Sequence, residues 1–327
     1  MKIAFFNLRP GEEEYLKTNL SEHELFLTRD PITPDQLPEQ KDFEVVSFFT
    51  DSKIDAAVID ALPDLKYLAA RSTGYDHVDL KTAEIKGIPV SNVPTYGENT
   101  VAEQTFALLL ALSRRIVKAV NSVKDSETFN REGLQGFDLK GKTIGIIGTG
   151  HIGIHVIKLA KAFEMEVIAF DAFANQNLAT DYGFKYVTLD ELLASSDIIS
   201  LHVPLLPETK NLINMENINK IKKGAVLINT ARGEIVEAGA LLTALEQGIL
   251  SGAGLDVMAD EESLRKGDIS DEDYQINKKI IDMESTLVTP HNAANTKEAY
   301  QRIMETTVDN IKSFISGAPK NLVKPHP

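Results

Sequence analysis

The 327-residue sequence contains no cysteine. This absence excludes disulfide bonds, thiolate nucleophiles and cysteine-based metal sites, and it fits a reducing compartment. Long apolar runs are also missing, since the longest, Phe106–Leu112, is far shorter than the roughly 18 residues of a membrane span. The first residues, Met1–Asn7, have too short an apolar run for a signal peptide. We therefore expect a soluble, cytoplasmic protein.

Basic residues are fewer than acidic residues in this sequence. Lysine and arginine number 34 against 48 aspartate and glutamate residues, which gives a formal net charge of −14. Such a chain repels phosphate backbones and anionic lipid head groups, so nucleic acid and membranes are poor candidate partners. There is no internal repeat and no low-complexity tract. We expect a small-molecule ligand and no bound metal.

The length favours two domains, each able to bury its own core. Short β-rich runs alternate with helical patterns over the first hundred residues, and a second alternating series begins at Thr143. Such alternation predicts an α/β fold with parallel sheets and crossover helices. We expect two doubly wound, Rossmann-like domains, one of residues 1–99 with 296–327 and one of residues 100–295. The predicted strands are 2–6, 43–49, 66–70, 88–92, 143–147, 166–170, 198–201, 225–229, 252–257 and 287–288.

A strong helix is predicted to begin at Asn99, where Thr100 and Glu103 have the spacing of a capping box. Its apolar residues run nearly all the way round the helix, so its own chain or a second subunit must cover it. We therefore expect a homodimer in which the helix of residues 100–120 takes part. Further on, the charged stretch 260–279 is interpreted as a surface excursion between two strands, and a helical pattern over 298–315 could pack back on the first domain.

A glycine pattern of the form G-x-G-x-x-G follows the predicted strand 143–147. Gly148 allows the tight turn, Gly150 lets a pyrophosphate approach the backbone, and Gly153 lets the helix that starts at His151 and Ile152 pack closely. Asp171 ends the next strand, about where the carboxylate that accepts ribose hydroxyls is expected. The alternative is an ordinary glycine turn with Asp171 as a helix cap.

The same aspartate bears on the choice of cofactor. Its charge repels a 2′-phosphate, and no lysine or arginine occurs between Ala172 and Phe184 to pair with one. The sequence therefore favours NAD over NADP.

Three ionisable residues follow predicted strands of the second series. Arg232 comes after strand 225–229, Glu261 after strand 252–257 with Asp260 and Glu262 as competitors, and His291 after strand 287–288. Ligands of doubly wound sheets bind beyond the carboxyl ends of the strands. A guanidinium can hold a carboxylate by two N–H bonds, an imidazole can give or take a proton, and a neighbouring carboxylate favours the imidazolium. Taken singly, each is more often a solvated or capping group.

Taken together, these motifs resemble the D-isomer-specific 2-hydroxyacid dehydrogenases, and within them the D-lactate dehydrogenase branch. The resemblance covers nearly the whole chain. It rests on the segments RSTGYDHVDL (71–80), VPTYGENTVAEQTFALLLALSRR (93–115), GTGHIG (148–153), SLHVPLLPETKNLIN (200–214), INTARGEIV (228–236), GLDV with the following DEE (254–262), and TPH (289–291).

The resemblance implies roles for particular residues. Arg232, Glu261 and His291 would be the catalytic set, backbone N–H groups near Thr73 and Gly74 would help to hold the substrate carboxylate, and Tyr96 would lie at the substrate. The residues expected beside the cofactor, besides the glycine loop and Asp171, are His202, Val203, Pro204, Thr230, Ala231 and Asp256. It also implies that residues 1–99 with 296–327 form the substrate domain, that residues 100–295 form the NAD-binding domain, and that the active site lies in the cleft between them.

The expected reaction is reversible hydride transfer between NADH and a 2-oxo acid, with pyruvate and D-lactate as the first pair. One departure concerns the substrate: lactate-branch members usually carry an aromatic residue three positions after the histidine, and Ala294 stands there. We therefore expect a roomier or more polar pocket, which Phe48, Phe49 or Tyr96 could line. The alternatives are a non-catalytic NAD(H)-sensing protein and an enzyme for another anion, such as phosphite or formate.

Overall fold

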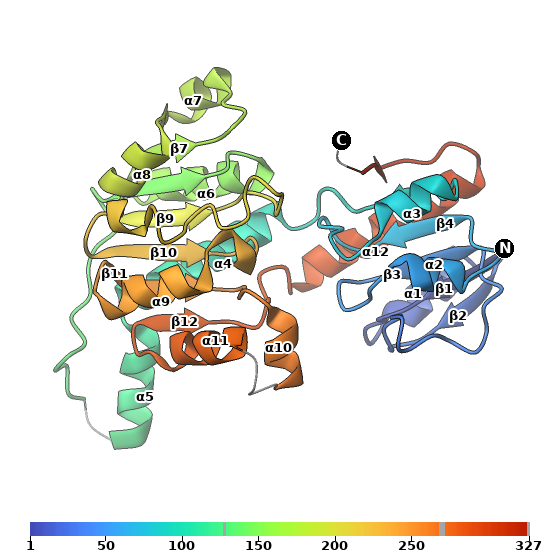
Figure 1. Cartoon of the computed structure of the whole chain (residues 1–327), viewed down its shortest axis with the longest axis horizontal. Coiled ribbons are helices and arrows are strands. Elements are labelled where there is room, and N and C mark those ends of the chain that lie inside the picture. The colour runs from blue at the N-terminus through green and yellow to red at the C-terminus, as the bar shows by residue number, and fades with distance from the viewer. Residues whose placement is uncertain (127–128, 268–271, 326–327) are drawn as a thin grey trace. The chain divides into compact units, whose positions relative to one another are not determined.

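The computed structural model describes residues 1–126, 129–267 and 272–325. The chain forms two compact units, residues 1–96 with 296–327 and residues 97–295 (Figure 1). Each unit is an α/β layer structure around its own sheet, and every strand expected from the sequence is present. Within these described residues, no helix is both long and apolar enough to cross a membrane.

The first unit contains a six-stranded sheet in the order β13-β5-β4-β3-β1-β2. All pairs are parallel except β13 with β5. The strands are β1 (Lys2–Phe5), β2 (Glu24–Leu27), β3 (Val45–Phe48), β4 (Tyr67–Ala70), β5 (Val90–Ser91) and β13 (Leu322–Val323). The helices are α1 (Glu12–Asn19), α2 (Ala56–Asp60), α3 (Leu80–Ile85) and α12 (Lys297–Ile315).

Helices cover both faces of this sheet, which is why its central strands are buried on both sides. One apolar cluster joins α2 and α3 to the sheet, and the other joins α1 and α12 to its opposite face. The C-terminal helix α12 packs through Met304, Val308 and Ile311, and the ring of Phe314 stacks on Tyr67 with 4.3 Å between centroids. The predicted return of this helix to the first unit is therefore confirmed.

The second unit contains a seven-stranded, wholly parallel sheet in the order β12-β11-β10-β9-β6-β7-β8. The order reverses between β6 and β9, and in such sheets ligands bind beside this switch point. The strands are β6 (Thr143–Ile147), β7 (Glu166–Phe170), β8 (Lys185–Tyr186), β9 (Ile198–Leu201), β10 (Ala225–Asn229), β11 (Leu250–Leu255) and β12 (Thr286–Val288).

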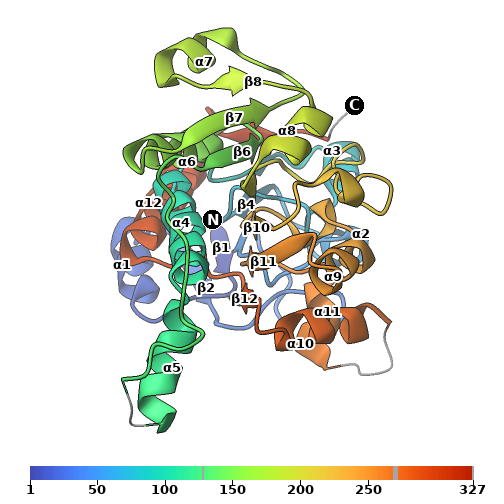
Figure 2. The same cartoon turned by 90° about the vertical axis from the view of Figure 1, so that its left-hand side faces the viewer.

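The helices of the second unit also lie on both faces of its sheet, with α4 and α6 on one side and α9 and α11 on the other (Figure 2). They are α4 (Glu98–Ser113), α5 (Ile116–Ser126), α6 (His151–Ala162), α7 (Gln176–Tyr182), α8 (Leu189–Ser195), α9 (Ala238–Glu246), α10 (Glu261–Lys266) and α11 (Glu272–Asp282), with short 3₁₀ turns at Ile218–Lys220 and Gly233–Ile235.

The predicted helix of residues 100–120 is wrong in two respects. Helix α4 begins earlier, with Gly97 as a cap that uses no side chain, so Thr100 lies inside the first turn and forms no capping box. The helix also ends at Ser113, because the Ser113 carbonyl accepts a hydrogen bond from Phe137 N and Arg115 turns into the left-handed region at φ 51°. A separate helix, α5, follows.

The apolar side chains of α4 are largely covered by other parts of the same chain. Phe106 and Leu109 are buried in the core that α4 shares with α6 and the sheet. The apolar side chains left exposed lie on α5 instead: Ile116, Val117, Val120 and Val123.

The charged stretch 260–279 lies between β11 and β12, and most of it is helical. Helices α10 and α11 occupy it, while residues 268–271 lie outside the described residues. It is anchored, since Ile280 at its end is buried and Asn277 Nδ2 donates to the Ala259 carbonyl at 2.5 Å.

Candidate active site

The loop after β6 has the backbone shape that a dinucleotide-binding turn requires. Gly148 has a φ of 97°, and a Cβ there would lie 2.6 Å from the His202 carbonyl oxygen. A Cβ on Gly153 would lie 2.1 Å from the Gly148 carbonyl oxygen. A Cβ on Gly150 would meet nothing within 4 Å, so the protein's own packing does not explain a glycine there. Open space beside the N-terminus of α6, which no side chain caps, fits an anionic ligand.

Asp171, directly after β7, is fixed against this loop. One carboxylate oxygen accepts hydrogen bonds from Thr149 N at 2.7 Å and Thr149 Oγ1 at 2.8 Å, and the other accepts from Phe173 N at 2.9 Å. Burial pushes the pKa of Asp171 up, but these hydrogen bonds outweigh it and hold the pKa below its usual value. The carboxylate stays ionised beside the glycine loop.

His202 follows β9 and borders the same loop. Its Nε2 lies 2.8 Å from Ser200 Oγ, and its Nδ1 is enclosed and has no hydrogen-bond partner among the described residues, although the residue as a whole is partly exposed. Burial lowers the pKa of His202 to about 3. A neutral imidazole therefore stands behind the glycine turn, with Val203 and the exposed Pro204 next along the chain. Taken by itself, the residue looked in the sequence like an ordinary polar strand end, which gave no sign of this burial.

The three ionisable residues predicted at strand ends follow strands that meet at one edge. Strands β10, β11 and β12 are parallel neighbours, so Arg232, Asp256 and His291 follow them at the same edge of the sheet. Glu261 is the first residue of α10, beyond Asp256.

His291 and Glu261 are in direct contact. The Nδ1 atom of His291 lies 3.1 Å from each carboxylate oxygen of Glu261. Of the competing acids, Asp260 accepts a hydrogen bond from Ser263 N as the cap of α10, and the side chain of Glu262 lies outside the description. The exposed fractions of the His291 and Glu261 side chains are 38% and 27%, so a ligand can reach the pair.

Asp256 holds the histidine loop. Its carboxylate accepts hydrogen bonds from Asn292 N at 2.8 Å, Ala293 N at 2.7 Å and the Thr289 hydroxyl, and its carbonyl accepts from His291 N at 2.8 Å. These bonds support His291 in the left-handed region at φ 50°. Burial raises the pKa of Asp256 in spite of them.

Arg232 is half-buried and stands in a loop tied to the end of β10. Asn229 Nδ2 donates to the Arg232 carbonyl at 2.8 Å, and Ala231 N donates to Asn229 Oδ1 at 3.0 Å. Thr230 Oγ1 lies 2.9 Å from Thr105 Oγ1 on α4. Sequence reasoning missed the supporting roles of Asp256, Asn229 and Thr289; the available signal was that each is a polar residue at the carboxyl end of a strand.

The residues expected at the substrate carboxylate, Thr73 and Gly74, lie in the first unit after β4. Thr73 Oγ1 donates to the Val93 carbonyl at 2.9 Å, and Asn92 Nδ2 donates to the Thr73 carbonyl at 2.8 Å. Within the described residues, the backbone N–H groups of Thr73 and Gly74 donate to no acceptor. Tyr96 is half-buried, and its carbonyl accepts a hydrogen bond from Arg302 Nε at 2.6 Å.

Comparison with known proteins agrees with this geometry. Residues 106–293 match the model of the D-isomer specific 2-hydroxyacid dehydrogenase NAD-binding domain. The chain is 39% identical to the glycerate dehydrogenase of Methylorubrum extorquens over 89% of each chain. It is 36% identical to the glyoxylate reductase of Korarchaeum cryptofilum, over 99% of this chain and 96% of the relative.

The chain belongs to the D-isomer-specific 2-hydroxyacid dehydrogenase family. A solved relative is the D-lactate dehydrogenase of Aquifex aeolicus, complexed with NAD and lactic acid, which is 34% identical, covers 99% of this chain and 100% of its own, and superposes with a TM-score of 0.90. This protein is thus an NAD-dependent oxidoreductase of the D-2-hydroxyacid dehydrogenase family.

The residues of this D-2-hydroxyacid dehydrogenase fit NAD. The space over Gly150 and the first turn of α6, with His151 and Ile152, suits a pyrophosphate, and the ionised Asp171 retains lone pairs for ribose hydroxyls. When bound, NAD supplies or accepts the hydride. The remaining chemistry, which is to bind an acid and to move one proton, needs the types of side chain found at the ends of β10 and β12.

Proposed function

We propose that this protein catalyses reversible hydride transfer between NADH and a small 2-oxo acid, giving a D-2-hydroxy acid, with pyruvate and D-lactate as the first substrate pair. Arg232 binds the substrate carboxylate, His291 exchanges the proton, and Glu261 orients the imidazole. The observation that carries the proposal is the contact of His291 Nδ1 with both oxygens of Glu261, which leaves Nε2 as the atom that serves the substrate.

In the reductive direction the carbonyl carbon accepts the hydride while the imidazolium of His291 gives its proton to the carbonyl oxygen. One C–H and one O–H bond form in the product, while the carbonyl π bond, the C–H bond of the hydride donor and the Nε2–H bond of the imidazolium break. The carboxylate of Glu261 fixes which ring nitrogen of His291 faces it and so leaves Nε2 for the substrate. In the oxidative direction the neutral imidazole takes the proton back.

The residues that the sequence assigns to the substrate also include some in the first unit. We assign residues 1–99 with 296–327 to the substrate domain and residues 100–295 to the NAD-binding domain. The undonated N–H groups of Thr73 and Gly74 suit a carboxylate oxygen, and Tyr96 contributes to the substrate surface. His202, Val203, Pro204, Thr230, Ala231 and Asp256 are assigned to the surroundings of the cofactor.

Steady-state oxidation of NADH with glyoxylate, hydroxypyruvate, pyruvate and longer 2-oxo acids tests the reaction. We expect turnover with NADH and much less with NADPH. His291→Gln should lower kcat roughly 100- to 10,000-fold, and Arg232→Ala should mainly raise the KM of the 2-oxo acid. Arg131→Ala, an exposed arginine, is the matched control. Full activity of Arg232→Ala would exclude the carboxylate clamp.

A bulkier or more polar 2-oxo acid is the second candidate for the substrate. It is favoured by Ala294, a small residue three positions after His291, and by relatives named as a glycerate dehydrogenase and a glyoxylate reductase. Ala294→Phe should then lower kcat/KM for long 2-oxo acids relative to pyruvate. An unchanged ratio would mean that this position does not set the substrate.

Two other outcomes would identify a different function. NADH binding without turnover of any 2-oxo acid would indicate an NAD(H)-sensing protein on the same fold, and turnover of phosphite or formate alone would indicate a different dehydrogenase. The cytoplasmic location expected from the sequence stays a prediction, which cell fractionation would test.

We also propose a homodimer, and the support for it is the apolar stripe on α5. Ile116, Val117, Val120 and Val123 are between 41% and 48% exposed. Val120→Lys should give a monomer in light scattering, whereas Asp125→Lys, on the opposite side of the helix, should leave the mass unchanged. A monomeric wild-type protein would exclude the dimer.

A further inference from the structure

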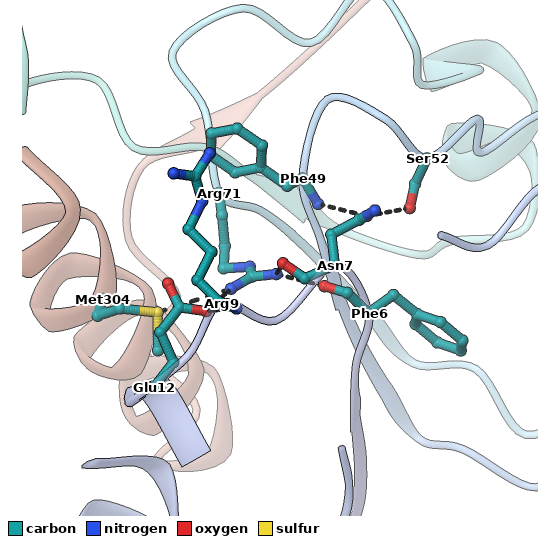
Figure 3. Close-up of polar contacts among 8 residues, drawn as sticks. All are labelled: Phe6, Asn7, Arg9, Glu12, Phe49, Ser52, Arg71 and Met304. Atoms are coloured by element: carbon teal, nitrogen blue, oxygen red, sulfur yellow. Dashed lines mark hydrogen bonds and ion pairs between the residues drawn. The ribbon is translucent and has the colours of Figure 1, made fainter. Parts of the chain in front are cut away.

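Arg71, outside the residues discussed so far, has an unusual position. It follows β4, directly before Ser72, Thr73 and Gly74, and is only 1% exposed. Its Nη1 atom lies 3.0 Å from Glu12 Oε2 and 3.7 Å from Met304 Sδ, while Nη2 donates to the carbonyls of Phe6 and, at 3.0 Å, Asn7 (Figure 3). A complete guanidinium is thus enclosed in the first unit.

Stability alone is a poor explanation for this ion pair. Removing a guanidinium and a carboxylate from water is costly, and well-packed apolar residues often give equal or higher stability. Burial lowers the pKa of Arg71, and the neighbouring Glu12, with a smaller contribution from Tyr300, opposes that shift. What a buried guanidinium offers instead is direction, because its planar fork fixes several acceptors in one arrangement.

The acceptors and donors around Arg71 belong to three loops. The fork of Arg71 and the carboxylate of Glu12, which also accepts from Arg9 N at 2.9 Å, fix the loop after β1. Asn7, in the left-handed region at φ 56°, extends the network to the loop after β3, because its Oδ1 accepts from Phe49 N at 3.3 Å and Ser52 Oγ at 2.5 Å. The third loop, residues 72–74, begins at Arg71 itself.

These loops leave the same edge of one sheet, since β1, β3 and β4 are parallel neighbours. Arg71 N donates to the Phe48 carbonyl at 2.8 Å, which ties the end of β4 to β3. The third loop carries the N–H groups of Thr73 and Gly74, which donate to no acceptor within the described residues. The first carries Arg9, whose guanidinium lies 3.6 Å from the ring centroid of Tyr300 and 5.4 Å from that of Phe49.

We propose that Arg71 and Glu12 are positioning residues for binding of the 2-oxo acid: their buried pair locks the loops after β1, β3 and β4 into the arrangement that presents the Thr73 and Gly74 N–H groups to the substrate carboxylate. This inference rests on the proposed function. The pair does not touch the substrate, and it lies in the first unit, whereas the glycine loop lies in the second. Loss of the pair therefore weakens substrate binding without weakening NADH binding.

The test compares KM for the preferred 2-oxo acid with Kd for NADH in the full-length protein. Arg71→Lys keeps the charge but loses the planar fork, and Glu12→Gln keeps the shape but loses the charge. Both should raise the KM about tenfold or more, as expected for loss of a hydrogen bond to a charged group, while Kd for NADH stays within about twofold. Val45→Ala, a buried residue at the start of β3 and thus at the opposite end of the sheet, is the control that lowers thermal stability without raising KM.

The outcomes are distinguishable. If the wild-type enzyme is active and the variants lower Tm as Val45→Ala does but leave KM unchanged, the positioning role is excluded while the proposed function stands. If the wild-type protein reduces no 2-oxo acid, the proposed function fails and this inference fails with it. Should both variants fail to fold, Ser52→Ala decides, because it removes the hydroxyl that donates to Asn7 Oδ1 and accepts from Ile32 N. A raised KM with unchanged Kd for NADH supports the role, and an unchanged KM excludes it.

Discussion

At the scale of single residues, the carboxylate of Asp256 is the part of the site that the sequence explains least. The sequence identified it only as an aspartate expected beside the cofactor. In the structure both of its oxygens face N–H and O–H donors of residues 289–293. A carboxylate is well suited to this position because it has only acceptors, and several donors converge on it.

Asp256→Asn should therefore lower activity although it keeps the shape of the side chain. The new amide NH₂ would face a backbone N–H of Asn292 or Ala293, which leaves a buried donor unpaired at a cost of about 1–3 kcal/mol. The loop that carries His291 would loosen, so kcat should fall about tenfold or more while Kd for NADH changes less. Asp197→Asn is a matched control, because Asp197 accepts from Thr143 N at the other end of the sheet. Equal losses of kcat in the two variants would contradict the role of Asp256.

His202 links one buried imidazole to the stability of the protein at different pH values. Its pKa is about 3 in the folded chain and about 6.5 in an unfolded chain. Between these values the unfolded state binds the proton and the folded state does not. The free energy of unfolding is therefore not lowered by His202 above about pH 6.5, and it falls as the pH drops towards 3. The loss can reach about 1.4 kcal/mol per pH unit.

His202→Gln should flatten this dependence. Urea midpoints at pH 7.5 and pH 5.5 measure it, and His151→Gln, an exposed histidine on α6, is the control. A variant that loses as much stability between the two pH values as the wild-type protein would exclude His202 as the responsible group.

At the scale of elements, glycine is present for two different reasons in the segment formed by β6, the glycine loop and α6. Gly153 is required by packing, because a Cβ would lie 2.1 Å from the Gly148 carbonyl oxygen. Gly150 is not, because a Cβ would point into open space. The motif predicted close packing at Gly153, which the surrounding atoms confirm, and it assigned Gly150 to a pyrophosphate, for which the open space leaves room.

Substitution by alanine should thus affect a different property at each of the two glycines. Gly153→Ala should lower Tm markedly, since backbone must move to relieve the contact. Gly150→Ala should leave Tm nearly unchanged and weaken NADH binding, because the methyl group occupies space assigned to the pyrophosphate. Thermal unfolding and NADH fluorescence titration measure both quantities. Unchanged NADH affinity in Gly150→Ala would contradict the placement of the cofactor.

Helix boundaries show where local patterns fail. The apolar run 106–112 correctly predicted a helix, because its length and apolarity dominate. The break at Arg115 could not be predicted, since it depends on a hydrogen bond from Phe137, which is distant in the sequence, to the Ser113 carbonyl. The short strands β2, β8 and β13 were missed for a similar reason: each is a marginal sequence that pairs only because an ordered neighbour presents its edge.

At the scale of the whole molecule, the sequence predicted the α/β class and two parallel sheets, because alternation of strands and helices leaves few other solutions. The ends of the predicted strands pointed to Arg232 and His291. They left Glu261 in competition with Asp260 and Glu262, and the family resemblance selected Glu261. The sequence did not reveal the pair of Arg71 and Glu12, which are 59 positions apart and meet only in the folded first unit. Buried polar partners that are distant in sequence leave no local pattern.

Because each unit has its own apolar core, NADH should stabilise them unequally. The residues assigned to the cofactor, from Gly148 to Asp171, from His202 to Ala231, and Asp256, all belong to residues 97–295. A ligand at 100 times its Kd stabilises the state that binds it by about 2.7 kcal/mol. Hydrogen exchange should therefore slow most for amides of β6, β10 and α6, and little for those of β1, β3 and α1, whose core includes none of the assigned cofactor contacts. Equal protection of both sets of amides would mean that the two units open as one cooperative structure, and protection confined to the first unit would exclude the assignment of NAD to the second.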